Sequence, residues 1–211
     1  MRYAIRQQGE SRSFPPGDPF HAGASAGGAV MIHLGTPLQA DDTKAAILIE
    51  LGTECLGVHT GEKAGEEGSN VLGFARYRNG ADPPSQLVEL VRQPNTRPEA
   101  IAAAKAVFEA AGLTVVVCSD QVGRIIDRLV RPKYNAALRF LDEGLASAKD
   151  MDTTCRLGLG YPDGPIERVE RGGLAYHHDV TAALFAATGA AAYAPARRAL
   201  VAKQRQGSDG S

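Results

Sequence analysis

Few side chains in this sequence could do chemistry by their type and spacing, and the most conspicuous are two consecutive histidines. His177 and His178 precede Asp179 in a segment with helical spacing. Adjacent residues of a helix point about 100° apart, so this pair is poorly placed to chelate one metal ion. We therefore interpret both histidines as a pair on a helix surface or at an interface, and the sequence predicts no metal site.

The three cysteines are the remaining candidates for nucleophiles or metal ligands. Cys55, Cys118 and Cys155 lie far apart and form no C-x-x-C pair, which argues against both a disulfide framework and a zinc ribbon. Free cysteine is among the most buried residue types. We expect these thiols to be reduced core residues rather than nucleophiles.

Apolar patterns divide the chain into two parts between two polar ends. Residues 1–28 and 203–211 lack apolar periodicity and predict a flexible arm and a flexible tail. Residues 29–120 alternate short apolar runs with helical patterns, which predicts a small α/β domain. Residues 121–202 lack strand signals and predict an all-α domain of four or five helices.

Individual elements can be placed within these parts. Apolar residues recur every three or four positions over 122–141, which predicts a long helix. Ser147 is suited to cap the next helix, Pro165 to open another, and a further helix is expected over 174–188. In the α/β part the patterns predict strands over 29–34, 55–59, 71–77, 86–91 and 113–118, and helices over 42–51 and 100–111.

Composition and charge exclude several classes of function. The 211 residues include 23 Lys and Arg against 24 Asp and Glu, a formal net charge of −1, and 44% are hydrophobic. This is ordinary for a protein with a real core, and it lacks the basic footprint of a nucleic-acid binder or a polybasic membrane anchor. With no long apolar segment and no apolar leader, we predict a cytoplasmic protein without nucleic-acid or membrane partners.

From residue 123 onward the chain carries a series of short motifs. This series resembles, in order and spacing, the C-terminal domain of the 3-hydroxyacyl-CoA dehydrogenases. Upstream, two segments are similar to the end of that family's NAD domain: VLGFARYR (71–78) and LVELVR (87–92). The C-terminal motifs are GRIIDRLVRP (123–132), NAA (135–137), DEGLAS (142–147), DMD (150–152) and GLGYPDGP (158–165).

The resemblance implies a Rossmann-type domain followed by a helical domain that pairs with its twin in a homodimer. It also implies reversible hydride transfer between NAD and the 3-hydroxyl of an acyl-CoA. In the family, a His oriented by a Glu takes the hydroxyl proton, and an Asn at the start of the helical domain holds the reacting oxygen. The Glu falls on Glu89 and the Asn on Asp127, but the His falls on Ala75, which cannot carry a proton.

The sequence lacks the glycine-rich loop that usually binds the phosphates of NAD, the cofactor that the resemblance implies. The strand expected over 29–34 should be followed by G-x-G-x-x-G, whose glycines let the backbone approach the pyrophosphate. Here Pro37 removes an N–H, and Asp41 and Asp42 would repel a phosphate. We therefore predict no cofactor-binding residues and a reduced Rossmann-type domain.

Four arginines stand near the positions that carry the family's chemistry, three of them where the family has aromatic or Asn residues. If the family geometry holds, they would converge on Glu89 and Asp127. They would then form a structural ion-pair network, or a pocket for an anion such as a CoA phosphate or an acyl carboxylate, unless they are solvent-exposed. These arginines are Arg76, Arg78, Arg124 and Arg128.

Three hypotheses of function follow. The first is a catalytically reduced member of the family that dimerises through its helical domain and contacts acyl-CoA. The second is an active NAD-dependent oxidoreductase with a variant site, in which Asp127 or Glu89 replaces the lost base. The third is a scaffold subunit that pairs with a full-length dehydrogenase.

Overall fold

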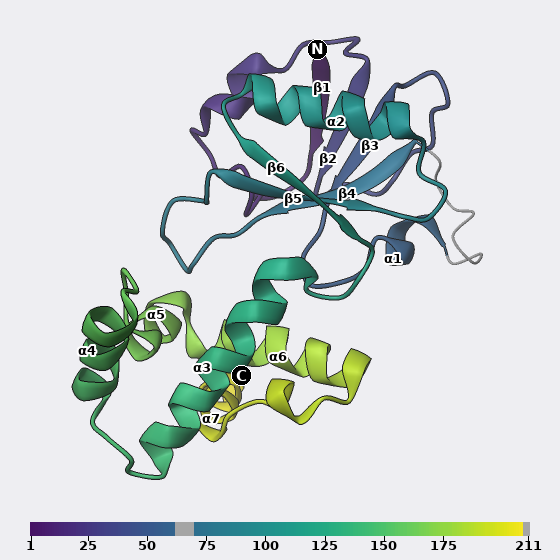
Figure 1. The fold of residues 1–211 in the computed structure, drawn as a ribbon. Helices are drawn as coiled ribbons and strands as arrows, with labels where there is room; N and C mark the ends of the chain where they lie inside the picture. Colours follow the sequence, from purple (N-terminus) through teal and green to yellow (C-terminus); the bar gives the residue numbers. More distant parts are fainter. Residues whose placement is uncertain (62–69, 209–211) are drawn as a thin grey trace. The chain divides into compact units, whose positions relative to one another are not determined.

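The computed structural model describes residues 1–61 and 70–208 (Figure 1). The chain divides into two compact units, each with its own apolar core. The first unit is an α/β layer structure and the second is helical, so the predicted fold class is confirmed. The first unit comprises Met1–Arg78 and Pro83–Arg124, and the second comprises Asn79–Asp82 and Ile125–Ser211.

The first unit is built on a six-stranded sheet whose strands lie side by side in chain order. The first four strands run parallel, the fifth is antiparallel to the fourth, and the sixth is parallel to the fifth. Most of the strands are rich in Val, Ile and Leu, which suit the pleated interior of a covered sheet. They are β1 (Tyr3–Gln7), β2 (Val30–Leu34), β3 (Ala46–Glu50), β4 (Val71–Arg76), β5 (Leu87–Arg92) and β6 (Thr114–Ser119).

Helix α2 (Pro98–Ala110) covers one face of this sheet, as Figure 1 shows. It begins with a proline, whose fixed φ and missing N–H suit a first turn, and its alanines favour the helix. Phe108 of α2 packs with Phe14 and Phe20 from the chain before β2, and with Phe74 of β4. This aromatic cluster forms the larger core of the unit.

The opposite face of the sheet carries a smaller core built from Ile49, Leu51 and Leu56. The chain leaves β3 across this face and forms the short helix α1 (Gly57–Thr60). A Cβ at Gly73 would lie 2.3 Å from the Leu51 side chain, so only glycine fits this position. The close packing holds the segment after β3 against β4.

The predicted flexible arm over residues 1–28 is wrong. Residues 3–7 form β1, which pairs with β2, and Phe14 and Phe20 are buried in the larger core. Burial of each phenylalanine contributes roughly 1.5–3 kcal/mol, which offsets the entropy cost of ordering a segment rich in Gly and Pro. Two isolated aromatic residues carry no periodicity, so the pattern did not reveal them.

Two predicted elements of the α/β part are also wrong, whereas the others are confirmed. Residues 46–50 form the central strand β3 rather than a helix, because both faces of that strand are buried and its apolar run shows no alternation. Residues 57–60 form α1 rather than a strand.

The second unit contains five α-helices within residues 124–208. The expected Ser147 cap is confirmed, since its hydroxyl accepts the N–H of Asp150 at 3.1 Å. The tail predicted over 203–211 is wrong for residues 203–208, which are helical, and residues 209–211 lie outside the described part. The helices are α3 (Arg124–Asp142), α4 (Ala148–Leu159), α5 (Pro165–Gly172), α6 (Leu174–Thr188) and α7 (Arg197–Ser208).

The GYPDGP motif joins α4 to α5 through one buried carboxylate. Asp152 of α4 accepts the backbone N–H of Ile166 at 2.8 Å and that of Glu167 at 3.1 Å, and so satisfies two orphan donors of α5. The Glu167 carboxylate in turn accepts the N–H of Gly164 at 2.6 Å. The motif is therefore a helix start. Within the described residues, no helix is long and apolar enough to cross a membrane.

Candidate functional site

Glu89 and Ala75 lie opposite each other on neighbouring strands. They are register partners in the β4 and β5 pair, on the face of the sheet away from α2. Both are buried, with 3% and 6% of their surface exposed. The position that would carry a base next to Glu89 therefore presents a methyl group.

Arg124 supplies the positive charge beside Glu89. Its Nε lies 3.7 Å from Glu89 Oε2, and its Nη2 donates to the carbonyl of Gly52 at 2.6 Å. Its Nε and Nη1 make no hydrogen bond within the described residues, and the side chain is 5% exposed. Arg124 has φ +47°, a region that non-glycine residues rarely adopt. The ion pair with the buried Glu89 carboxylate explains why an arginine, rather than a glycine, occupies this backbone conformation.

Cys118 of β6 is half-buried and feels the charges of both Glu89 and Arg124. Burial, together with the charge of Glu89, raises the pKa of the Cys118 thiol to about 11. A thiol with this pKa is almost fully protonated at neutral pH, and the thiolate is the nucleophilic form. Cys118 is therefore not an activated nucleophile.

Asp127 belongs to the second unit, near the start of α3. Its carboxylate accepts a hydrogen bond from Arg131 Nε at 2.8 Å, one helical turn along, and both side chains are nearly buried. The Asp127 carboxylate is therefore engaged by a cation of its own helix. The Glu89–Arg124 pair of the first unit and the Asp127–Arg131 pair of the second are each consistent with a structural ion pair.

Arg76 does not face Glu89, and the prediction that it converges there is wrong. Neighbouring residues of a strand point to opposite faces, so Arg76 lies on the α2 face while Ala75 lies on the other. Its Nη1 donates to Asp18 Oδ2 at 2.8 Å and to the Ser13 carbonyl at 2.9 Å. For Arg78 and Arg128 the convergence stays a prediction.

His177 is fully buried inside the second unit, so the expectation of a surface or interface histidine is wrong for it. Its Nε2 lies 2.9 Å from Asn135 Oδ1, and Asn135 Nδ2 donates to the carbonyls of Ala192 and Ala194. Asn135 Oδ1 must therefore accept, and His177 Nε2 carries the proton. Arg131 Nη1 lies 3.4 Å from His177 Nδ1, which is left as an acceptor.

Burial, reinforced by the charge of Arg131, lowers the pKa of His177 to about 3. In the unfolded chain His177 takes up a proton near pH 6.5, whereas in the folded chain it stays neutral down to about pH 3. Between these two pH values the unfolded state binds more protons, so the stability of the fold is greatest above pH 6.5 and falls as the pH falls toward 3. We expect His177→Gln to remove up to about 1.4 kcal/mol per pH unit from the slope of stability in this window. Urea denaturation between pH 7 and 4 measures this slope.

His178→Gln is the matched control, because it removes the neighbouring imidazole, which pairs with Asp179 outside the core. An equal change of slope in the two variants would contradict the neutral state of His177.

Comparison with known proteins connects this geometry to one family. The model of the 3-hydroxyacyl-CoA dehydrogenase C-terminal domain matches residues 123–210. The human mitochondrial hydroxyacyl-coenzyme A dehydrogenase is 37% identical over 92 residues, which are 44% of this chain and 29% of that protein. Residues 123–210 are therefore similar to the C-terminal domain of the 3-hydroxyacyl-CoA dehydrogenases.

Two further proteins with similar sequences or folds are also named as dehydrogenases of a 3-hydroxyacyl-CoA. The 3-hydroxyadipyl-CoA dehydrogenase of Escherichia coli K12 is 46% identical over 55 residues, 26% of this chain and 12% of that protein. The crystal structure of (S)-3-hydroxybutyryl-CoA dehydrogenase from Ralstonia eutropha matches 87% of this chain and 66% of its own, with TM-score 0.71 and 20% identity. That likeness extends over the fold of both units. The matched sequence spans under a third of the human relative's length.

The residues at the end of β2 do not fit NAD, the cofactor that the resemblance implies. No α-helix lies between β2 and β3 in residues 35–45, so no helix N-terminus meets the end of β2 to receive a pyrophosphate. A Cβ at Gly35 would lie 2.4 Å from the Gln8 carbonyl oxygen. The chain's own backbone therefore takes the space that a phosphate cradle would need.

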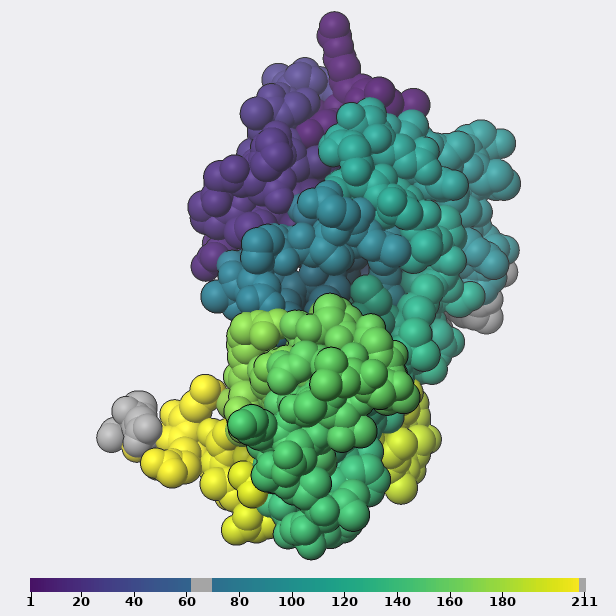
Figure 2. All heavy atoms as spheres, turned by 60° about the vertical axis from the view of Figure 1, so that its left-hand side comes forward, coloured from purple at the N-terminus to yellow at the C-terminus, as the bar shows by residue number. Residues whose placement is uncertain are grey.

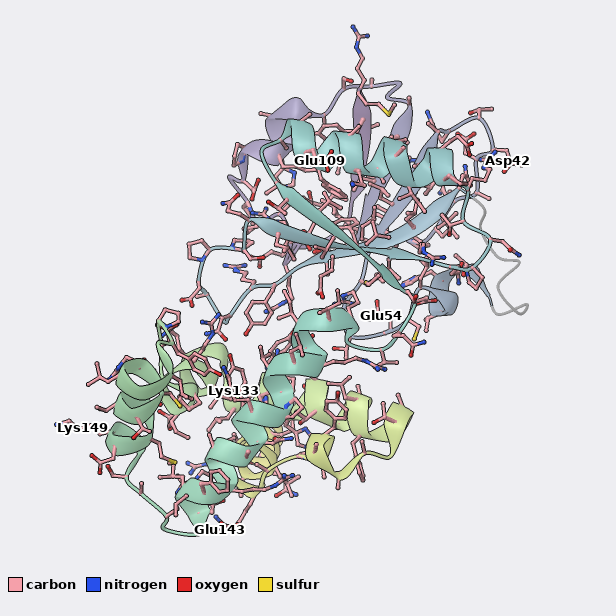
Figure 3. The ribbon with its side chains drawn as sticks, in the orientation of Figure 1. Asp42, Glu54, Glu109, Lys133, Glu143 and Lys149 are labelled. Atoms are coloured by element: carbon pink, nitrogen blue, oxygen red, sulfur yellow. The ribbon has the colours of Figure 1, made fainter. Side chains whose placement is uncertain are left out.

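Sequence analysis missed a carboxylate–histidine pair in the segment after β3. Glu54 Oε1 lies 3.2 Å from His59 Nε2 and accepts the N–H of Gly52 at 3.0 Å. Burial acts to raise the pKa of Glu54, but these hydrogen bonds outweigh it and hold the pKa below its ordinary value. Figure 3 shows Glu54 near α1. A strand would point residues five apart to opposite faces, so only the helical turn unites the pair.

Proposed function

We propose that this chain is a catalytically reduced member of the family. It contacts acyl-CoA and pairs with a second copy of itself, but it transfers no hydride on its own. One observation carries the proposal: Glu89 is balanced by the Arg124 cation, and Ala75 occupies the position across from it.

The chemistry of a histidine–carboxylate pair explains why this arrangement matters. The imidazole becomes positively charged when it takes the proton, and the carboxylate stabilises that charge. Here the guanidinium of Arg124 already balances the charge of Glu89, and the methyl group of Ala75 cannot accept a proton. Loss of a general base typically lowers a rate by 10²–10⁴-fold.

Exposed apolar side chains support the pairing of two copies. Leu129 on α3 and Leu157 and Leu159 on α4 are between 63% and 84% exposed. Such residues on a helical domain are typical of a surface that another protein covers. The cytoplasmic location also stays a proposal, since the human relative is named as mitochondrial.

A titration of the full chain with acetoacetyl-CoA and, separately, with NADH tests this function. Acetoacetyl-CoA at 100 times its Kd should stabilise the chain by about 2.7 kcal/mol in a thermal melt. We expect no stabilisation by NADH, and no loss of NADH absorbance when both are present. Stabilisation by NADH together with turnover would contradict the proposal.

A second candidate, an active oxidoreductase, is favoured by the Glu54–His59 pair, which supplies a histidine beside a carboxylate. Gly52 links this segment to Arg124, because its N–H donates to Glu54 and its carbonyl accepts from Arg124. If turnover occurs and His59→Gln abolishes it, the second candidate replaces the first.

A further inference from the structure

The first unit contains a cavity of about 340 Å³ that the family's chemistry does not use. It lies between the C-terminal turns of α2 and the 3-10 turn η1 (Pro19–Gly23). Figure 2 shows the N-terminal segment and α2 side by side on the surface of this unit. We propose that this cavity binds a small neutral molecule with an apolar body and one carbonyl group.

The walls of the cavity are apolar. The rings of Tyr3 and Phe20 stack with their centroids 4.6 Å apart, and Val107 and Leu113 close the opposite side. The Tyr3 hydroxyl donates to the Phe20 carbonyl at 2.6 Å, so its polar end is already satisfied. A wall of this kind binds the hydrocarbon part of a ligand, and the volume lies in the range of cavities that hold small molecules.

The polar end of the cavity is the guanidinium of Arg76, whose side chain is only 4% exposed. Its Nε donates to the Ser85 carbonyl, and its Nη1 donates to Ser13 and Asp18. Its Nη2 donates no hydrogen bond within residues 1–61 and 70–208. The N–H groups of Arg76 Nη2 can therefore donate to an acceptor inside the cavity.

The charge around Arg76 selects a neutral acceptor over an anion. Asp18 Oδ2 lies 2.8 Å from Arg76 Nη1, so the pair carries no net charge, and a ligand carboxylate would meet the Asp18 carboxylate. A carbonyl oxygen accepts from Nη2 without this repulsion. The site therefore favours a ketone or an amide on an alkyl or aryl body, and it is independent of the proposed function.

The test uses the full chain and three probes that share a phenylethyl body and differ beyond it: 4-phenyl-2-butanone, butylbenzene and 3-phenylpropanoate. Saturation-transfer NMR measures the binding of each. We expect saturable binding of the ketone and weaker binding of the hydrocarbon and the carboxylate. A hydrocarbon that binds as tightly as the ketone, or a ketone that does not bind, would overturn the proposal.

Two alanines of α2 provide matched variants. Ala110 lines the cavity and Ala102 does not, although both are exposed. Ala110→Phe should abolish ketone binding, whereas Ala102→Phe should keep it; equal binding by both would place the ketone elsewhere. Arg76→Lys keeps the positive charge beside Asp18 but removes the guanidinium and its Nη2 donors. It should therefore weaken ketone binding about tenfold. Thermal melts confirm that each variant is folded.

Discussion

Arg124→Ala is expected to lower the free energy of unfolding by about 3–5 kcal/mol, the typical cost of removing one partner of a buried ion pair. Glu89 is 3% exposed and would lose the guanidinium of Arg124, whose Nε lies 3.7 Å from Glu89 Oε2. The Gly52 carbonyl would also lose its 2.6 Å hydrogen bond. Urea denaturation of the full chain at pH 7 measures the change.

Two further variants make this experiment specific. Glu89→Gln combined with Arg124→Met removes both charges and should recover most of the lost stability, because a neutral pair of similar volume avoids the desolvation cost. Arg97→Ala removes an exposed arginine of the same unit and should change stability by less than about 0.5 kcal/mol. If Arg124→Ala instead leaves stability intact and weakens acyl-CoA binding, the region is a pocket for an anion.

Gly164→Ala is the second change with a large expected effect. A Cβ at this position would lie 2.2 Å from Asp152 Cβ and Oδ1, a separation that side-chain carbons do not tolerate. Asp152 must then move away from the first turn of α5, where it accepts the N–H groups of Ile166 and Glu167. Overpacking together with a lost cap costs about 2–5 kcal/mol. Thermal and urea unfolding measure this loss.

Gly158 supplies the control for this variant. It lies inside α4, and a Cβ there would meet nothing closer than a Thr154 methyl at 4.0 Å. Gly158→Ala should therefore raise stability by roughly 0.5–1 kcal/mol through better helix propensity. Similar losses in the two variants would show that the fit between Gly164 and Asp152 is not what limits α5.

The sequence predicted the helical unit better than the sheet unit, for physical reasons. Helix ends carry chemical marks such as Ser147 and Pro165, and the structure uses both as expected, while Gly189 ends α6 in the left-handed conformation. A central strand such as β3 is apolar on both faces and has no mark that separates it from a short helix. The segment before β2 is ordered by tertiary packing of two phenylalanines, which no local pattern records.

The candidate site was predictable only in part. Ala75 and Glu89 follow from the alignment of motifs, and the strand pairing places them together. The wrong placement of Arg76 could have been avoided, since adjacent residues of a strand face opposite sides. Burial of His177 depends on Asn135, which lies 42 residues earlier in the chain, and no spacing rule connects the two.

The pairing of Arg124 with Glu89 has a consequence for how this chain could change in evolution. A histidine restored at position 75 would meet a carboxylate whose charge is already balanced, so this substitution alone would gain little. Loss of Arg124 alone would remove a cation from beside the buried Glu89 carboxylate and destabilise the unit. Each single step is unfavourable or without benefit, and the two positions are therefore epistatic. Acid–base chemistry at this place would return only through both changes together.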